Sequence, residues 1–172
     1  MAAIRDYILK IISKPKRELT KNEPNYFEHD PEALQRLLKR INRQGDLRDQ
    51  ANPSPLVTLE EFFVGNSDFG SIGYNFNPPL PPQEFFGFFR SIREKPEVFD
   101  VRVQVNGQEE PDRWPWSDTI WIITSAKADE VGRWMGEHFR ADALLIGFEQ
   151  DCRKLEEYRF PEGMNAIGVW WD

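Results

Sequence analysis

Carboxylate side chains cluster with tryptophan and arginine in one short stretch of the sequence. The stretch contains four acidic residues, one arginine and two tryptophans, namely Glu109, Glu110, Asp112, Asp118, Arg113, Trp114 and Trp116. Acidic side chains at this spacing can bind a cation or transfer protons, whereas tryptophan and arginine are the residues that most often anchor protein interfaces. We therefore predict a partner-binding surface made of Glu109, Glu110, Asp112, Arg113, Trp114, Trp116 and Trp170.

The same stretch also has a purely structural interpretation. An acidic loop between two strands is commonly a solvated hairpin tip, and tryptophans often fill the ends of a hydrophobic core. The sequence leaves both interpretations open.

No residue pattern in the sequence predicts catalysis, a metal site or a cofactor. The chain has two histidines, His29 and His138, and one cysteine, Cys152, without the spacing of a zinc site. Ser117 lacks the Gly-x-Ser-x-Gly turn that would present it as a nucleophile, and the glycines between residues 65 and 73 lack phosphate-loop spacing. We predict a non-enzymatic protein with no catalytic residue, no metal ligand and no cofactor.

Charge is distributed unevenly along the chain. Residues 1–50 contain 11 Lys and Arg against 8 Asp and Glu, a net charge of +3, whereas residues 51–172 contain 11 against 21, a net charge of −10. An acidic body repels the phosphates of nucleic acids and attracts basic proteins. We therefore predict a basic protein as the partner and no binding of nucleic acid.

Composition favours an ordinary globular protein. The 172 residues lie within the usual length of one domain, and 40% of them are hydrophobic. The apolar runs at residues 120–123 and 143–148 are far shorter than the roughly 20 residues that span a bilayer. The single cysteine is consistent with a reducing compartment. We expect a cytoplasmic protein that has no membrane segment and is a monomer or a homodimer.

The first 50 residues are predicted to be helical. Apolar residues at helical spacing predict a helix over residues 2–13, and Asp30 followed by Pro31 is typical of the start of a second helix. The proline-rich residues 51–55 resemble a linker and coincide with the change in charge. We predict an N-terminal helical extension over residues 1–50 and an α+β domain over residues 56–172.

The body of the chain has the order strand, helix, strand, strand, helix, strand. Its four strands are predicted at residues 72–76, 101–105, 119–124 and 143–148. This order is typical of the ferredoxin-like split βαβ sandwich, in which the first and third strands are central and both helices pack on one face. The predicted fold class is therefore α+β, a ferredoxin-like βαββαβ sandwich with an extra C-terminal strand at residues 166–171 and additional N-terminal helices.

The predicted strand at residues 119–124 is apolar on both faces. Ile120 and Ile122 lie on one side, and Trp121 and Ile123 lie on the other. Such a strand needs cover on both faces of the sheet, because an uncovered apolar face would be a sticky patch. If helices cover Ile120 and Ile122, two covers remain for Trp121: the N-terminal helices, which we favour, or a second protein.

Residues 57–66, 70–73, 114–126 and 169–172 carry a resemblance to known sequences. They resemble a group of bacterial hypothetical proteins, over about residues 57–172 and not over the N-terminal helices. The resemblance implies a bacterial, cytosolic origin and assigns no catalytic residue.

Three hypotheses for function follow. The first is an acidic protein-binding module, in its most specific form an immunity-type inhibitor of a basic toxin or nuclease. The second is a ligand-binding or enzymatic domain with a pocket on the sheet lined by Tyr74 and Trp121. The third is a structural subunit that dimerises through the open face of the sheet.

Overall fold

The computed structural model describes residues 29–150 and 154–172, and the helix predicted over residues 2–13 lies outside this part of the chain. The helices are α2 (Pro31–Ile41), α3 (Leu59–Phe63), α4 (Pro82–Arg93) and α5 (Ala128–Met135), with short 3-10 turns η1 (Asn42–Gln44) and η2 (Phe148–Gln150). The strands are β1 (Leu56–Thr58), β2 (Val98–Gln104), β3 (Thr119–Thr124), β4 (Ala143–Ile146) and β5 (Asn165–Trp170).

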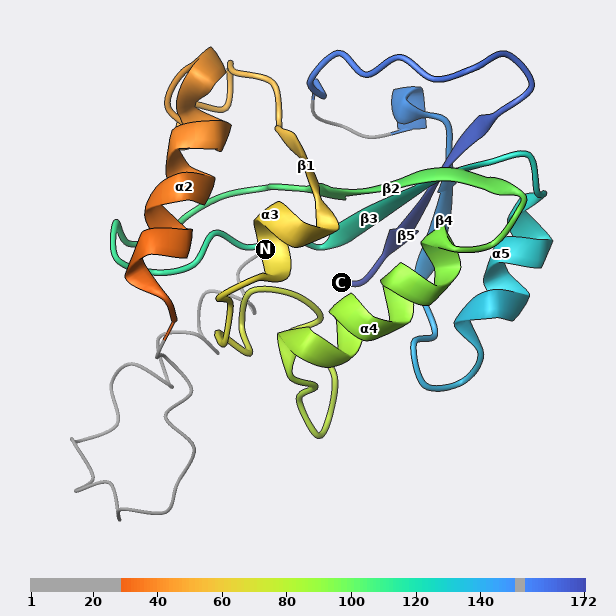
Figure 1. The fold of residues 1–172 in the computed structure, drawn as a ribbon, viewed down its shortest axis with the longest axis horizontal. Helices are drawn as coiled ribbons and strands as arrows, with labels where there is room; N and C mark the ends of the chain where they lie inside the picture. Colours follow the sequence, from red (N-terminus) through yellow and green to blue (C-terminus); the bar gives the residue numbers. More distant parts are fainter. Residues whose placement is uncertain (1–28, 151–153) are drawn as a thin grey trace.

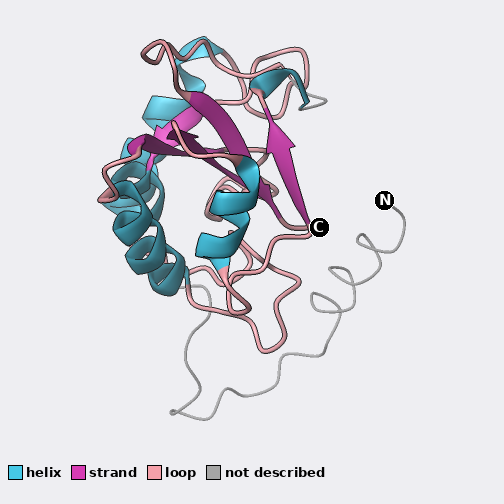
Figure 2. Ribbon diagram, turned by 90° about the vertical axis from the view of Figure 1, so that its right-hand side faces the viewer, coloured by secondary structure: helices cyan, strands magenta, loops and turns pink. Residues whose placement is uncertain are grey.

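The strands form one five-stranded sheet in the order β1-β2-β3-β5-β4, and every neighbouring pair is antiparallel. Strands β3 and β4 therefore run in the same direction with β5 between them, and α5 connects them along the chain. Helices α3, α4 and α5 lie below the sheet in Figure 1, whereas the segment after β4 crosses above it. Figure 2 shows the sheet between these two layers. The predicted α+β class is confirmed.

The ferredoxin-like arrangement is not confirmed, because the first strand is in the wrong place. Residues 72–76 form a turn in which Phe76 N donates to Gly73 O over 3.0 Å, and only Ile72 makes a bridge, to Ser117. Gly73 has a φ of +56°, and a Cβ there would lie 2.5 Å from the Phe85 ring, so the chain turns back toward the core. The first strand is instead β1, which lies at the edge of the sheet and not at its centre.

Strand β3 is buried on both faces, as its sequence predicts. All six of its residues are buried. Ile120 and Ile122 belong to the main core with the helices, whereas Trp121 and Ile123 belong to a second, smaller cluster on the other face. The Trp121 ring lies over Gly168 of β5, where a Cβ would approach it to 2.9 Å.

Among the described residues, this second cluster is covered by a segment that was not predicted as a cover, and the predicted helix over residues 2–13 lies outside the described part. The described residues that pack on Trp121 and Ile123 come mainly from the segment between β4 and β5, namely Leu145, Phe148, Leu155, Tyr158, Phe160 and Met164. We call residues 154–164 the strap. The strap therefore lies over the face through which the third hypothesis would have the chain dimerise. Trp121, which the second hypothesis places in the lining of a pocket, is 0% exposed.

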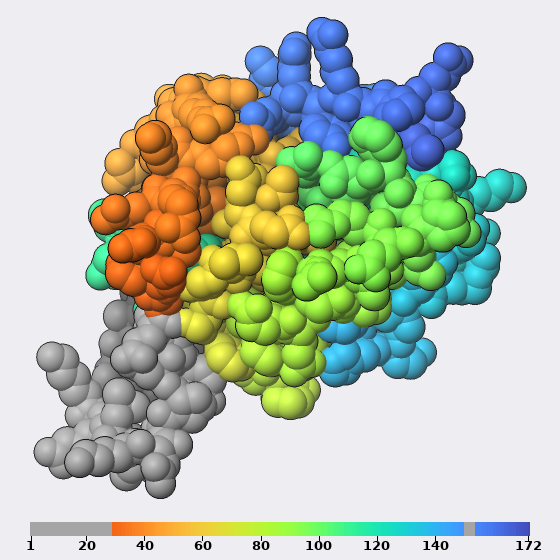
Figure 3. Space-filling view, in the orientation of Figure 1, coloured from red at the N-terminus to blue at the C-terminus, as the bar shows by residue number. Residues whose placement is uncertain are grey.

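Helix α2 packs into the main core on the opposite side. Asp30 caps it as predicted, since Asp30 Oδ1 accepts from Glu32 N at 2.9 Å and Ala33 N at 3.3 Å. Its buried residues Leu34, Leu37 and Ile41 join the same cluster as Val57. Figure 3 shows α2, in orange, directly against the yellow residues of α3. The division of the chain at residues 51–55 stays a prediction, because residues 1–28 lie outside the described part.

Candidate functional site

The acidic loop between β2 and β3 has a defined conformation. Its ends are joined by an antiparallel bridge in which Trp116 N donates to Gly107 O at 2.8 Å and Asn106 N donates to Trp116 O at 2.9 Å. Within the loop, Gln108 Nε2 donates to the carbonyl oxygens of Pro111 and Arg113 at 3.2 and 2.9 Å. Backbone pairing and one glutamine side chain thus hold the loop.

The predicted partner-binding residues divide into exposed and buried ones. Exposed side chains are those of Glu109, Glu110, Asp112 and Trp116, the last with 37% of its surface accessible. Arg113 is half-buried, with its Nε 3.9 Å from Asp68 Oδ2, and Trp170 is half-buried at the end of β5.

Trp114 differs from the expectation that it contacts a partner. It is 3% exposed, and its ring meets His29 edge to face at a centroid distance of 5.7 Å. The structural interpretation, in which tryptophans fill the ends of the core, describes Trp114. It also describes Trp171, which packs against Phe85 and Phe89. Both tryptophans are next to buried residues in the chain, since Trp114 precedes a buried proline and Trp171 follows a buried strand. Their rings therefore pack in the core.

A shallow groove runs beside the acidic loop. It has a volume of about 470 Å³ and lies between the end of α2 and the loop, lined by Leu38, Asn42, Gly45, Asp46, Arg48, Gln108, Glu109, Glu110 and Pro111. Hydrogen bonds from Arg48 lower the pKa of Asp46 to about 2, so this carboxylate is ionised and paired. The groove therefore presents Glu109 and Glu110 as its acidic wall.

A second acidic group lies at the end of the sheet where β3 and β4 begin and β5 ends. Asp118 precedes β3, and its Oδ1 accepts from Asn106 Nδ2 and Thr119 Oγ1, both at 2.7 Å. Asp142 precedes β4 and Asp172 follows β5, and Asp172 N donates to Asp142 Oδ2 at 3.0 Å. Antiparallel pairing of β4 with β5 brings these two residues together.

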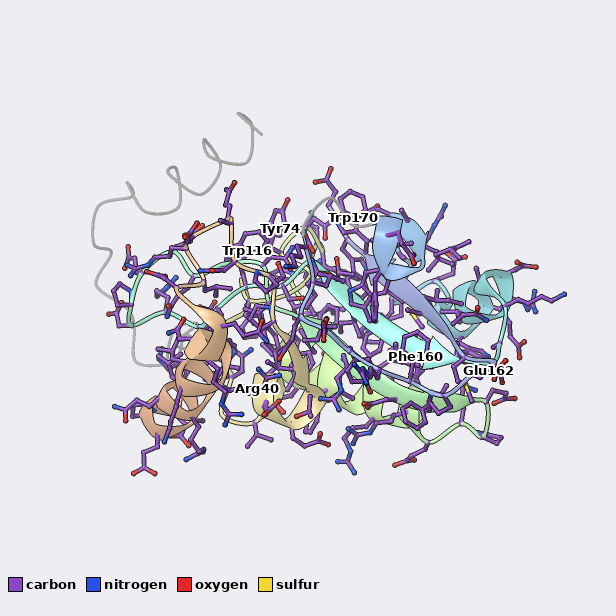
Figure 4. The ribbon with its side chains drawn as sticks, turned by 90° about the horizontal axis from the view of Figure 1, so that it is seen from above. Arg40, Tyr74, Trp116, Phe160, Glu162 and Trp170 are labelled. Carbon is purple, nitrogen blue, oxygen red and sulfur yellow. The ribbon has the colours of Figure 1, made fainter. Side chains whose placement is uncertain are left out.

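Tyr74 lies beside these three carboxylates and is 38% exposed. Burial raises the pKa of its phenol, and the negative charges of Asp172, Asp118 and Asp142 raise it further. Figure 4 shows Tyr74, Trp116 and Trp170 along the same side of the molecule, away from Arg40 and Phe160. Exposed aromatic and acidic side chains from four separate segments therefore share one side of the protein.

This electrostatic environment gives a direct prediction. The substitution Asp142→Asn removes one negative charge near Tyr74, so the phenolate forms more easily and the pKa of Tyr74 falls toward its usual value. A pH titration followed by NMR of the tyrosine rings measures this shift. Tyr158 is the internal control, because burial and a hydrogen bond to Asp100 raise its pKa instead, and its titration should not move. An unchanged pKa at Tyr74 would show that Asp142 does not act on it.

Sequence reasoning missed Asp142 and Asp172 as members of this surface. Each flanks a strand, and only the pairing of β4 with β5 reveals that they meet. Tyr74 was named, but as part of a sheet pocket with Trp121, which lies in the strap-side cluster instead.

Ser117 and His138, the candidate nucleophile and base, have different partners in the structure. Ser117 is buried, and its Oγ donates to Thr119 O at 3.1 Å. His138 is exposed and its Nε2 lies 3.2 Å from Glu84 Oε2 on α4. Within residues 29–150 and 154–172, no group of three or more His, Cys, Asp or Glu side chains could hold a metal ion.

The fold and this surface define an α+β protein with one antiparallel sheet, two covered sheet faces and an acidic, aromatic side. The chain belongs to the uncharacterized protein YfbO family, whose model matches residues 32–169. The predicted resemblance to an uncharacterised bacterial group is thereby confirmed. The match begins within α2, so it extends further toward the N-terminus than the predicted residues 57–172.

The chain is similar to the uncharacterized protein YfbO of Escherichia coli (strain K12). The two are 36% identical over 139 residues, which cover 81% of this chain and 98% of the relative. No solved structure matches the chain. Among the helices described, none combines the length and the apolar composition needed to cross a membrane.

Proposed function

We propose that the chain is a non-enzymatic protein-binding module whose partner is a basic protein. In its most specific form, the chain is an immunity-type inhibitor that neutralises a basic toxin or nuclease. The observation that carries the proposal is the exposure of Trp116 beside the acidic loop. Trp116 is 37% exposed and lies next to exposed acidic side chains, as expected for an interface anchor surrounded by a polar rim.

The charge of the body supports the same partner. Residues 51–172 have a net charge of −10, and the loop carboxylates Glu109, Glu110 and Asp112 are exposed. A negative patch attracts a positive protein before contact and raises the association rate, by an amount that falls as salt screens the charges. The chain thus recognises its partner through a basic patch on the surface of the partner.

A capture experiment with two matched variants tests the proposal. The wild-type chain is used as bait in a lysate of its host, beside a loop variant, Glu109→Gln, Glu110→Gln, Asp112→Asn. The control is Glu137→Gln, Glu157→Gln, Glu162→Gln, which removes the same charge from exposed positions elsewhere. We expect wild type and control to retain one basic protein that the loop variant loses.

Direct binding of the purified pair then separates recognition from general acidity. The association rate of wild type should exceed that of the loop variant by about tenfold at low salt, and the difference should shrink at high salt. In the immunity form, an equimolar amount of the chain inhibits the partner. Capture of no specific protein, or equal loss of it in both variants, would contradict the proposal.

A further inference from the structure

Two carboxylates at the end of the sheet, those of Asp142 and Asp172, form no ion pair with another described residue. Asp172 N and Asn75 Nδ2 both donate to Asp142 Oδ2, at 3.0 and 3.1 Å, so the position of this carboxylate is fixed. The hydrogen bonds orient the carboxylate of Asp142, and no cationic side chain in the described part of the chain neutralises it.

An exposed aromatic ring lies in the field of these charges. Tyr74 precedes Asn75 along the chain, and Asn75 Nδ2 donates to Asp142 Oδ2 at 3.1 Å, so this hydrogen bond holds the Tyr74 segment beside the Asp142 carboxylate. Burial, and after it the charges of Asp172 and Asp142, raise the pKa of the Tyr74 phenol. A cation is attracted both by the face of an aromatic ring and by neighbouring carboxylates. The combination favours an organic cation that can use the two contacts together.

We propose that Tyr74, Asp142 and Asp172 form an anchoring site for an arginine side chain of the basic partner. The guanidinium group is planar, so it stacks on an aromatic ring while its edge donates paired hydrogen bonds to a carboxylate. This inference rests on the proposed function and adds one specific contact to it. The contact lies on the same side of the molecule as Trp116 (Figure 4).

A divalent metal ion fits these residues less well. Calcium takes six to eight oxygen ligands and magnesium takes a regular octahedron. Asp142 Oδ2 already accepts two hydrogen bonds, and the described residues contain no cluster of the size that a metal requires. A guanidinium needs only one or two carboxylate oxygens and the ring.

Titration with a short arginine peptide, acetylated and amidated at its ends, tests the site on the full chain. NMR signals of the Tyr74 ring report binding, and a peptide with citrulline in place of arginine keeps the shape without the charge. We expect the arginine peptide to shift the Tyr74 signals and the citrulline peptide to leave them in place. Equal shifts from both peptides, or none from either, would overturn the inference.

Matched variants then locate the site. The variant Asp142→Asn, Asp172→Asn should bind the arginine peptide about tenfold more weakly, whereas Glu137→Gln, Glu157→Gln should change binding by less than about twofold. Tyr74→Leu, which keeps both carboxylates, should also weaken binding. All these side chains are exposed, so circular dichroism should show unchanged folding. Equal weakening in the first two variants would overturn the inference in favour of general attraction by the acidic body.

Failure of this test is distinct from failure of the proposed function. A basic protein that is captured through the acidic loop, while Asp142→Asn, Asp172→Asn binds it normally, would refute the arginine site and leave the protein-binding function intact. A chain that captures no basic protein would refute the function whatever the peptide does.

Discussion

Replacing Trp121 by alanine is expected to lower the free energy of unfolding by about 3–5 kcal/mol, the usual cost of removing a large buried aromatic side chain. Trp121 is 0% exposed and fills the space between the sheet and the strap. Its ring meets Phe148 edge to face at 4.9 Å and lies over Gly168, which offers no side chain to fill the cavity. Urea denaturation followed by circular dichroism measures the loss.

Two further substitutions test whether the loss of stability comes from the buried ring of Trp121. Trp116→Ala removes the same side chain from an exposed position and should cost less than about 1 kcal/mol. Trp121→Phe keeps most of the apolar contact but loses the hydrogen bond from Nε1 to Gln104 Oε1, which is 2.7 Å long, so it should cost about 1–3 kcal/mol. Similar losses for Trp121→Ala and Trp116→Ala would mean that the strap-side cluster does not contribute as a core.

The elements that the sequence predicts well are those with local signals. Helix α4 shows apolar positions Phe85, Phe89 and Ile92 at helical spacing, and all three are buried. Thr58 and Glu61 have the sequence spacing of a capping box and form one, with Thr58 N donating to Glu61 Oε2 at 2.8 Å. Periodicity and capping act within a few residues, so one sequence is enough to detect them.

The wrong strand shows the limit of local patterns. Residues 72–76 alternate apolar and small residues as a strand does, but Ile72 and Phe76 enter the core from a turn, and Phe76 packs against Phe85 and Trp171. The three-residue strand β1 was not among the predicted strands. Whether a short segment joins a sheet depends on the partner strand, which is remote in sequence.

The strap was missed because it has no regular secondary structure. Its apolar residues Leu155, Tyr158, Phe160 and Met164 alternate irregularly with charged ones, so periodicity gives no signal. The need for a cover was nevertheless predictable, since both faces of β3 are apolar. Sequence reasoning therefore showed that Trp121 must be covered, but it did not identify the strap as a cover, and helix α2 packs into the main core instead.

The candidate site also has one part that the sequence predicts and one part that it does not. Composition alone identified the acidic loop, where Glu109, Glu110 and Trp116 prove to be exposed. The group of Tyr74, Asp142 and Asp172 is assembled by strand pairing across about a hundred residues of sequence, and no local pattern marks it. A surface made by the ends of neighbouring strands becomes visible only when the strand order is known.

Replacing Glu156 by alanine is expected to lower the free energy of unfolding by about 2–3 kcal/mol and to loosen the strap. Glu156 joins the strap to two elements, because its carboxylate accepts from Arg40 Nη2 at 2.9 Å and from Leu56 N at 2.9 Å. The side chains of Arg40 and Glu156 are only 18% and 17% exposed, so removing the carboxylate leaves a poorly solvated guanidinium. Urea denaturation and limited proteolysis measure the two effects.

The adjacent residue provides the matched control. Glu157 is exposed, and Glu157→Ala should change stability by less than about 0.5 kcal/mol and leave proteolysis of the strap unchanged. Lys154 and Glu156 also pair through their backbones with Ser54, at 2.8 and 2.9 Å, so the strap should remain attached but open more often. Faster cleavage of the Glu156→Ala strap, with normal cleavage in Glu157→Ala, would show that the ion pair holds the cover over Trp121. Equal cleavage rates in both variants would show that the apolar contacts of Leu155, Tyr158 and Phe160 hold it without the ion pair.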